Sequence, residues 1–591
     1  MLAVTTTKER IFITRSARSF ALIALLLASL AAAAWVVVIR FKPPDSDAYV
    51  RASGRQLVQH AAPVILRAVN FSNFYWMDLG QFGFDLKTSR HHSEIDFERV
   101  RDLGFNSIRF AFNGNWYREN PRAFWRWLDQ NVKWAEQHEV MLTLDLHVPI
   151  GGFWLDPNSD KLDFSLWTDE ALRLQNIEMW RAIAARYKNS TAIAAYELLN
   201  EAVTDDATGA QWESLAQDMV QAIRQVDGNH LLVVGALYGT DRHYRTKDRD
   251  SLFLVDDSNV MYDFHFYHPI EYTHQSASWI ETPMGDGGTY PDNETPIPTG
   301  KQVLLADSSI RSQRLRPADT VWLPYESDWV ELTDPTAIAG LPTMVMRSGA
   351  GGTVNFDDVQ VIEYDAASAQ LKQTVSAPIT QDSVWQWWGW GNADLASTST
   401  ALARAEIGGA NDRYSLKIDA RTTPEQYLGW SSDKFWFRVT PGNLYKITGK
   451  MKGSGVSYPE SESDEVAFAG LELNFYSDPT SGDDPAFLFR NKAYLEARFL
   501  EMYQFGVANN VPMSVLEFGT ILETFETDGK GGEKWIADIL DIVQAHDTSF
   551  ALWVYRGPAM GLYLCEYGTG PQNPNLKLMR VLKEKLGDWG N

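Results

Sequence analysis

The sequence predicts an α/β protein: a (β/α)8 barrel with a β-sandwich inserted after its sixth strand and an apolar segment near the N-terminus. Apolar, strand-like runs alternate with amphipathic stretches over residues 61–294. The alternation stops over residues 295–488 and resumes over residues 489–591. Strands that alternate with helices form a parallel sheet through right-handed crossovers, and eight such units close a barrel.

Eight strand-like runs support this barrel, six before the interruption and two after it. The stretches between them have the apolar periodicity of helices. The expected strands are 64–70, 105–111, 140–146, 193–199, 230–235, 259–266, 512–517 and 549–555. The expected helices include 120–138, 167–188, 208–225, 491–508, 533–546 and 574–586.

The segment 295–488 has a different character. It is punctuated by Pro and Gly and contains short alternating runs such as 353–364, 414–418 and 435–439. Short strands with turn signals between them are typical of an antiparallel sandwich. Because the segment follows the sixth strand directly, it extends a βα loop, and these loops surround the active-site mouth of a barrel.

The N-terminal region predicts export from the cytoplasm. Residues 1–19 form a basic tail, and residues 20–39 carry no charge. Twenty helical residues span ~30 Å, the thickness of a bilayer's hydrocarbon core. We expect a transmembrane anchor; the alternative is a signal peptide cleaved near Ala31–Ala34. In either case the catalytic part faces outward, membrane-anchored or secreted, after a linker over residues 40–60.

Composition narrows the class of partner. The chain of 591 residues is too long for one hydrophobic core. Its formal net charge of −23 would repel nucleic acid and favours a neutral ligand. A single cysteine, Cys565, excludes an intramolecular disulfide. No Cys/His cluster has the spacing of a structural zinc site. We expect no metal in the active site and no cofactor.

Two glutamates end strand-like runs: Glu201 follows residues 193–200, and Glu517 follows residues 511–516. The C-terminal ends of barrel strands meet at one face, where catalytic groups lie. Glycosidases need two facing carboxyl groups, one protonated and one ionised. The pair therefore indicates sugar chemistry, and the inserted segment accounts for its 316-residue separation in sequence.

Further polar and aromatic residues stand at the other strand ends. Taken singly, an arginine there is often an ion-pair partner, a histidine an interior residue and a tryptophan part of the core. They are Arg109, His147, Asn200, His265, Tyr267 and Trp553.

Together with the two glutamates, this ordered set resembles glycoside hydrolase family 5, the cellulase-like retaining β-glycosidases. The resemblance covers residues 64–270 and 490–587. It implies that Glu517 is the nucleophile and Glu201 the acid/base. The first strand differs slightly from the family pattern. Family members often have Arg-Gly-hydrophobic-Asn there, whereas this chain has Ala68 at the position of the glycine.

The resemblance also implies substrate-binding roles for the remaining six residues. Arg109 and Tyr267 would favour the ionised form of Glu517 through a fixed charge and a hydroxyl donor. Asn200 would donate to a sugar 2-hydroxyl. His147 and His265 would position hydroxyls and carboxyls, and Trp553 would offer an apolar face to a pyranose.

Other residues of the barrel are expected to support or line the site. Even spacing puts Asp145 and Glu197 on the faces of His147 and Glu201, which predicts a buried polar layer beneath the site. Asn70 and the residues after it could line the cleft, with Trp76 either a sugar platform or a packing residue.

The inserted segment resembles jelly-roll carbohydrate-binding modules with its halves in exchanged order, which a circular permutation would explain. Such a permutation would bring the two ends of the insertion together. Residues Trp385–Trp390 could stack on sugars or form the sandwich core, and the core is favoured. Asp357 and Asp358 could hold a structural calcium.

The resulting prediction is a retaining hydrolase that cleaves a β-glucan or cellulose-like glycan, with mannan as an alternative substrate. A transglycosylase with the same residues is a second hypothesis, and a catalytically silent carbohydrate-binding protein is a third. The expected partners are a glycan and, through the N-terminal helix, a membrane.

Overall fold

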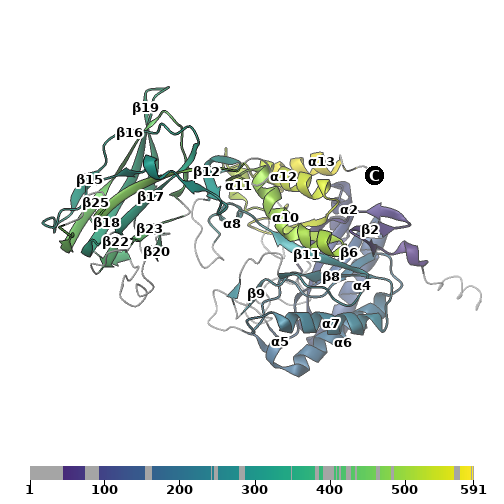
Figure 1. Cartoon of the computed structure of the whole chain (residues 1–591). Coiled ribbons are helices and arrows are strands. Elements are labelled where there is room, and N and C mark those ends of the chain that lie inside the picture. The colour runs from purple at the N-terminus through teal and green to yellow at the C-terminus, as the bar shows by residue number, and fades with distance from the viewer. Residues whose placement is uncertain are drawn as a thin grey trace, which may run out of the picture. The chain divides into compact units, whose positions relative to one another are not determined.

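The fold comes from a computed structural model, in which the chain divides into two compact units (Figure 1). The first unit comprises residues 1–266, 501–519 and 543–591, and the second comprises 267–500 and 520–542. Each unit is described by itself. The structure describes residues 44–591 except 74–91, 153–162, 241–242, 245–250, 278–286, 348, 378, 380–384, 391–404, 408, 411–413, 421–426, 433–434, 461–465, 481–484, 565–572, 588 and 590–591.

The first unit contains a closed barrel of eight parallel strands, which confirms the predicted (β/α)8 fold. Around the barrel the order is β4, β5, β6, β7, β8, β11, β28 and β29, with β29 pairing back to β4. The strands are β4 (Arg67–Phe71), β5 (Ser107–Asn113), β6 (Met141–Val148), β7 (Ile193–Glu197), β8 (Leu231–Gly235), β11 (Val260–Phe266), β28 (Met513–Phe518) and β29 (Ser549–Leu552).

Helices connect these strands as the apolar periodicity indicated. Local capping defines their ends: Asn120 accepts a hydrogen bond from Ala123 N at the start of α4, and Asp169 accepts one from Ala171 N at the start of α6. The longer helices are α2 (Glu94–Asp102), α4 (Pro121–His138), α6 (Glu170–Tyr187), α7 (Ala210–Arg224), α10 (Lys492–Asn509), α12 (Gly532–Ala545) and α13 (Leu576–Gly587).

A small antiparallel sheet precedes the barrel, where part of the segment had been expected to be a linker. It consists of β1 (Arg51–Ser53), β2 (Gln56–Gln59) and β3 (Ala62–Val64). Leu57 is buried in a cluster with barrel residues such as Ala68 and Ala195. Burial of apolar surface against the barrel therefore orders most of residues 51–64.

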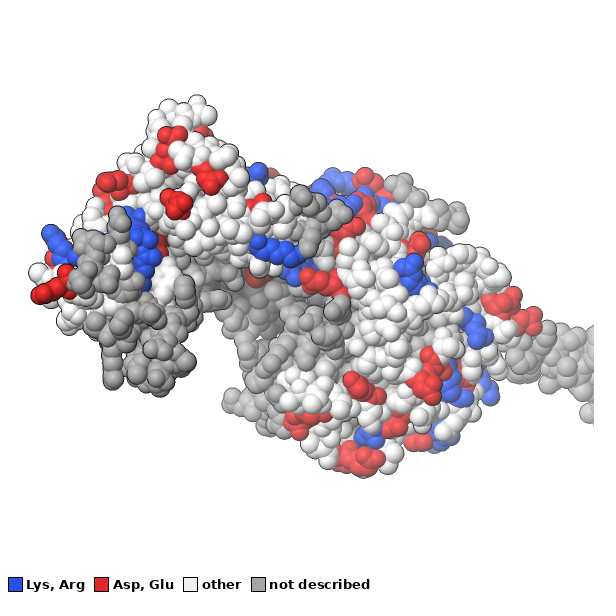
Figure 2. All heavy atoms as spheres, in the orientation of Figure 1, with Lys and Arg blue, Asp and Glu red and all other residues white. Residues whose placement is uncertain are grey.

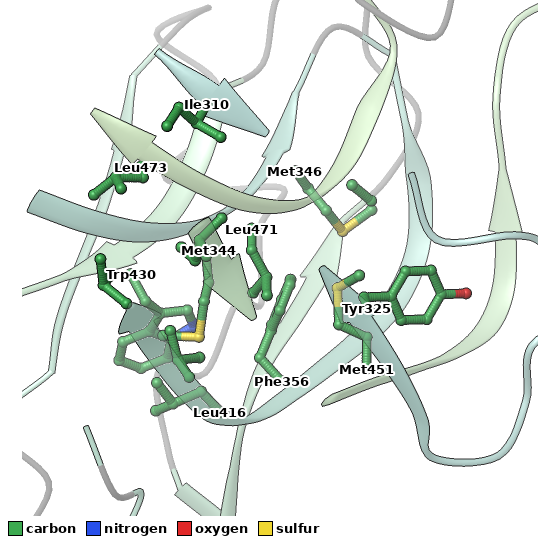
Figure 3. Packing of buried hydrophobic residues seen from close by; sticks show 14 of the residues in the cluster. Ile310, Tyr325, Met344, Met346, Phe356, Leu416, Trp430, Met451, Leu471 and Leu473 are labelled. Carbon is green, nitrogen blue, oxygen red and sulfur yellow. The ribbon is translucent and has the colours of Figure 1, made fainter. Parts of the chain in front are cut away.

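The second unit contains two antiparallel seven-stranded sheets. Both contribute to one core, in which Met344 and Leu471 from one sheet pack with Phe356 and Met451 from the other (Figure 3). The main strands are β17 (Ala337–Arg347), β20 (Gln386–Trp390), β23 (Tyr427–Ser431) and β26 (Phe468–Ser477) in one sheet, and β18 (Gly351–Asp365), β19 (Gln370–Ala377), β22 (Tyr414–Ala420) and β25 (Leu444–Ser457) in the other.

The ends of this inserted segment pair with each other. β12 (Asp292–Pro298) and β27 (Phe487–Arg490) run antiparallel, with Ile297 opposite Leu488. Trp385 lies in the shared core and its ring contacts that of Phe435. The tryptophan side chains of β20 lie outside the described residues.

Several sequence expectations fall on residues that the structure does not describe. They concern the basic tail 1–19, the apolar segment 20–39, Trp76 and Cys565. In the part of the chain that is described, no helix combines the length and the apolar character needed to cross a bilayer.

Candidate active site

Barrel strand ends bring together seven of the eight candidate residues. Arg109 lies on β5, His147 on β6, His265 on β11 and Glu517 on β28. Asn200 and Glu201 follow β7, and Trp553 follows β29. The eighth, Tyr267, follows β11, and its ring lies edge-on to His274 with centroids 4.9 Å apart. Its expected hydrogen bond to Glu517 stays a prediction.

Arg109 is completely buried and organises the centre of the site. Its Nε and Nη2 donate to the two oxygens of Glu197 at 2.7 and 2.6 Å. Nη1 donates to Glu517 Oε1 at 2.6 Å, and Nη2 donates to Asn200 Oδ1 at 2.7 Å. Burial alone would lower the pKa of Arg109, but neighbouring carboxylates raise it well above the ordinary value. The guanidinium is therefore a fixed positive charge.

Asn70 had been expected to line the cleft, but its side chain is buried in the structural network. Its Oδ1 accepts from Arg109 Nη1 at 2.9 Å, and its Nδ2 donates to the carbonyls of Leu516 and Leu552 at 3.0 and 3.2 Å. One amide thus ties three neighbouring strands to the guanidinium. The residue type at the end of the first strand was the only sequence signal for this role.

The buried polar layer beneath the site is confirmed. Asp145 and Glu197 are buried, with relative exposures of 0% and 1%. Asp145 Oδ2 lies 3.2 Å from Arg109 Nη2, and Glu197 holds the guanidinium with both oxygens. Burial raises the pKa of Asp145 to about 7, although Arg109 opposes the rise. This layer fixes the direction in which Arg109 points.

The two candidate catalytic glutamates have different surroundings. One oxygen of Glu201 and one of Glu517 lie within 4.8 Å of each other, with a nitrogen of His265 in the same cluster. Glu517 has the Arg109 guanidinium beside it, which compensates a negative charge. Burial raises the pKa of Glu201, although His147 and Arg109 oppose the rise. The site therefore favours a proton on Glu201.

Hydrogen bonding assigns the tautomer of His147. Asn200 Oδ1 accepts from Arg109, so its Nδ2 must be the donor toward His147 Nε2 at 3.3 Å. Nε2 then accepts, and Nδ1 donates to Asp145 Oδ2 at 2.7 Å. Burial lowers the pKa of His147 to about 3, which keeps the ring neutral. Among the described residues, no acceptor faces the second N–H of Asn200, which is therefore available to a ligand.

Trp553 is partly exposed and stacks on this histidine. The ring centroids of His147 and Trp553 are 5.7 Å apart with an angle of 20° between the planes. Stacking on a ring that Asp145 holds in place orients the indole. The indole is therefore held in a defined orientation beside the polar network.

Two residues near His265 were missed from the sequence. Asp263 is buried and its Oδ2 lies 3.5 Å from His265 Nε2, and the hydroxyl of Tyr238 accepts a hydrogen bond from the backbone N–H of His265. Asp263-Phe-His265 repeats the spacing of Asp145-Leu-His147. That repeat was the available signal for Asp263, whereas nothing in the sequence singled out Tyr238.

The closed parallel barrel carries two carboxyl groups, a buried arginine and a stacked tryptophan at its strand ends. This combination is typical of a barrel glycosidase. Comparison with known families agrees: the sequence matches Cellulase (glycosyl hydrolase family 5) over residues 72–393. The chain belongs to this family. The reaction of this family requires no cofactor.

Curated relatives point the same way. The chain is 31% identical over 202 residues to Endoglucanase C of Acetivibrio thermocellus, which covers 32% of this chain and 55% of that protein. It is 25% identical over 239 residues to Cellodextrinase A of Ruminococcus flavefaciens, which covers 39% and 67%. The chain thus spans about half the length of the first of these relatives.

Solved structures are more distant. Thermotoga maritima Cel5A in complex with cellobiose aligns with a TM-score of 0.43 and 13% identity, over 88% of this chain and 97% of that one. The cellulose synthase subunit Z of Clostridioides difficile aligns with a TM-score of 0.43 and 13% identity, over 88% and 99%.

Proposed function

We propose that the protein is a retaining glycoside hydrolase that cleaves β-glycosidic bonds of a glucan by double displacement. The main support is the pair Glu201 and Glu517, whose oxygens lie within 4.8 Å while Arg109 contacts Glu517. Retaining enzymes hold their carboxyl groups about 5–5.5 Å apart, whereas inverting enzymes need roughly 6.5–9.5 Å to admit a water.

In the first step Glu517 attacks the anomeric carbon while Glu201 gives its proton to the leaving oxygen. The bond to the leaving sugar breaks, and a glycosyl ester forms on Glu517. Arg109 donates to Glu517 Oε1, which orients the carboxylate for the attack. The free N–H of Asn200 is available to a sugar hydroxyl as positive charge develops on the ring.

In the second step Glu201, now ionised, removes a proton from a water that attacks the same carbon. The ester on Glu517 is released, and the product keeps the β configuration. A sugar hydroxyl in place of water would give transglycosylation, so analysis of the products distinguishes the two reactions.

The proposed substrate is a β-linked glucan or cello-oligosaccharide. The relatives carry names that refer to glucan and cellodextrin cleavage. Acidic and basic side chains are interspersed on the face shown in Figure 2, which suits a neutral polymer better than a polyanion. A panel of cello- and manno-oligosaccharides tests the choice of sugar, and preference for mannan would overturn the glucan assignment.

Replacement of Glu517 tests the mechanism. Glu517→Ala should abolish hydrolysis of barley β-glucan and of an aryl cellobioside. With azide present, Glu517→Gly should form a glycosyl azide of inverted configuration, because azide enters the space of the missing carboxylate. Unchanged turnover by Glu517→Ala would refute the assignment, and binding without turnover by the wild-type protein would favour a silent carbohydrate-binding protein.

We also propose that the sandwich unit binds glycan on the outward face of the sheet that contains β17, β23 and β26. Met344 and Leu471 of this sheet point into the core. On the opposite face the buried Glu472 holds two partly exposed side chains: its Oε2 accepts from the Tyr427 hydroxyl at 2.8 Å, and its Oε1 lies 3.0 Å from Arg347 Nη2. Fixed charged groups beside an aromatic ring suit a polyhydroxylated, neutral ring.

Affinity electrophoresis tests this second site. In a Glu517→Gln background, which preserves the glycan, Tyr427→Ala should lose retardation in a gel that contains soluble glucan. The matched control is Lys446→Ala, because Lys446 pairs with Glu326 in the other sheet. Equal retardation of both variants would contradict glycan binding at Tyr427.

The calcium expectation remains a prediction. Asp357 Oδ2 accepts a hydrogen bond from Ala410 N, and Asp358 Oδ2 lies 2.8 Å from Lys450 Nζ. A calcium-dependent rise in the melting temperature of the sandwich would support such a site.

The proposed location outside the cytoplasm depends on the sequence of residues 1–39 alone. Fractionation of cells that express the full chain tests it. Recovery with the membrane would support an anchor, and a shortened N-terminus in the medium would support a cleaved signal peptide.

A further inference from the structure

Asp263 lies behind His265, and its two carboxyl oxygens have different neighbours. Oδ1 accepts hydrogen bonds from Ser514 Oγ at 2.9 Å and from the backbone N–H of Leu516 at 2.8 Å. Oδ2 lies 3.5 Å from His265 Nε2. The side chain of Asp263 is therefore held by β28 with one oxygen turned toward the imidazole.

The other ring nitrogen of His265 faces both catalytic glutamates. Nδ1 lies 2.8 Å from Glu201 Oε1 and 3.4 Å from Glu517 Oε2. Burial lowers the pKa of His265 to about 4, so the ring is neutral and only one of its nitrogens carries a proton. The identity of that nitrogen determines what Glu201 can do.

The acid step needs the proton on Nδ1. In that tautomer Nδ1 donates to Glu201 Oε1, and the acidic proton of Glu201 resides on Oε2, where it is available to the leaving oxygen. In the other tautomer the bare Nδ1 would accept the proton of Glu201 and would place a lone pair toward Glu517. Only the first tautomer prepares Glu201 as a general acid.

The charges around Asp263 decide whether it is ionised. All five N–H groups of Arg109 already have acceptors in Glu197, Glu517, Asn70 and Asn200, so the guanidinium has none left for Asp263. Burial and the neighbouring Glu197 raise the pKa of Asp263 well above its ordinary value. The charge of Arg109 and the hydrogen bonds from Leu516 N and Ser514 Oγ lower this pKa but do not cancel the rise.

Among the described residues, the other groups near His265 are Glu197, with an oxygen within 4.8 Å of a ring nitrogen, the carboxyls of Glu201 and Glu517, and the Tyr238 ring, whose centroid lies 5.1 Å from that of His265. An ionised Asp263 would draw the ring proton to Nε2, whereas a protonated Asp263 offers its own O–H to Nε2. The contact of 3.5 Å is long for a hydrogen bond. The charge of Asp263 therefore influences which nitrogen of His265 carries the proton as much as the hydrogen bond does.

We propose that Asp263 works in its protonated form as a positioning residue, which holds His265 as the Nδ1–H tautomer and so keeps the proton of Glu201 directed at the substrate. The inference rests on the proposed function, since it assumes that Glu201 is the acid. It also distinguishes this Asp-x-His pair from Asp145 and His147, where the aspartate accepts a hydrogen bond from Nδ1–H.

Two substitutions at Asp263 test the proposal. Asp263→Asn keeps a neutral donor toward Nε2 and should retain kcat/KM for an unactivated cello-oligosaccharide within about threefold. Asp263→Ala removes the donor and should lower it by about tenfold or more, within the range that general acid catalysis contributes. On a dinitrophenyl cellobioside, whose leaving group needs no proton, Asp263→Ala should keep near wild-type activity.

Asp227→Asn is the matched control, because Asp227 also holds a buried histidine, with Oδ2 2.6 Å from His230 Nδ1, but lies outside the site. It should lower the melting temperature and leave the pH profile of kcat/KM unchanged.

The contrary results are equally definite. A loss of about 100-fold or more in Asp263→Asn would show that an ionised aspartate is required, as in serine protease triads. Equal losses on both substrates in Asp263→Ala would show a purely structural role. If Asp263→Ala does not fold, Asp263→Asn still distinguishes a protonated aspartate from an ionised one. Glu201→Gln is the reference: if it lowers kcat/KM equally for both substrates, the acid assignment itself fails.

Discussion

At the scale of single residues, the site depends on how completely Arg109 is used. Five N–H donors meet five acceptor oxygens on Glu197, Glu517, Asn70 and Asn200. Only a planar guanidinium can present this fork of donors. The residue type was readable from the sequence, but its four partners were not, because they come from separate strands that only the closed barrel brings together.

Replacement of Arg109 by lysine keeps the charge and loses the geometry. Arg109→Lys should lower kcat/KM by about 100-fold, because an ammonium lacks the planar fork of donors that holds Glu517 and Glu197 together. It should also destabilise the barrel by about 1–3 kcal/mol, because the three donors of an ammonium leave some of the five buried acceptor oxygens without a partner. Arg224→Lys is the control: Arg224 pairs with Asp257 away from the site and should affect stability alone.

The raised pKa of Glu201 predicts the sign of the pH dependence. Below this pKa Glu201 carries the proton that the leaving oxygen needs, and above it the proton is lost. kcat/KM for an unactivated cello-oligosaccharide should therefore fall as the pH rises through the raised pKa. A pH series on a dinitrophenyl cellobioside should lack this alkaline limb, and its presence there would indicate another group.

At the scale of elements, long periodic segments were predictable and short ones were not. α4 and β11 follow the sequence expectation closely because each has a sustained apolar period. β1 to β3 were missed because each has only three or four residues. Their order depends on packing against the barrel, which no local pattern encodes.

The contribution of the small sheet can be measured at Leu57, which is 4% exposed within the barrel cluster. Leu57→Ala should destabilise the barrel by about 2–4 kcal/mol through loss of buried surface and the cavity that remains. kcat/KM should not change. Leu254→Ala is the control, because Leu254 is 53% exposed. Equal melting temperatures for the two variants would show that the sheet is not integral to the barrel.

At the scale of the whole molecule, the sequence predicted the barrel because eight strand-like runs alternate with helical ones. It missed the tautomer-setting role of Asp263, since an aspartate two residues before a histidine looks the same whether it is ionised or protonated. That distinction depends on Glu197 and Arg109, which come from other strands.

The antiparallel pair of β12 and β27 suggests how the inserted segment can be removed. Pro298 lies opposite Phe487, so a short Gly-containing turn can join the two strands after deletion of residues 299–486. The shortened protein should keep activity on an aryl cellobioside and lose binding to soluble glucan. Unchanged glucan binding would contradict the proposed role of the sandwich unit.

The central claim is that Glu517 forms a covalent glycosyl-enzyme, and trapping of that intermediate tests it most directly. A 2-deoxy-2-fluoro cellobioside with a good leaving group slows both steps but permits accumulation of the ester. Peptide mass spectrometry should then find one added fluoro-glycosyl group on Glu517. A label on another residue, or formation of an α-configured product without a label, would contradict the account.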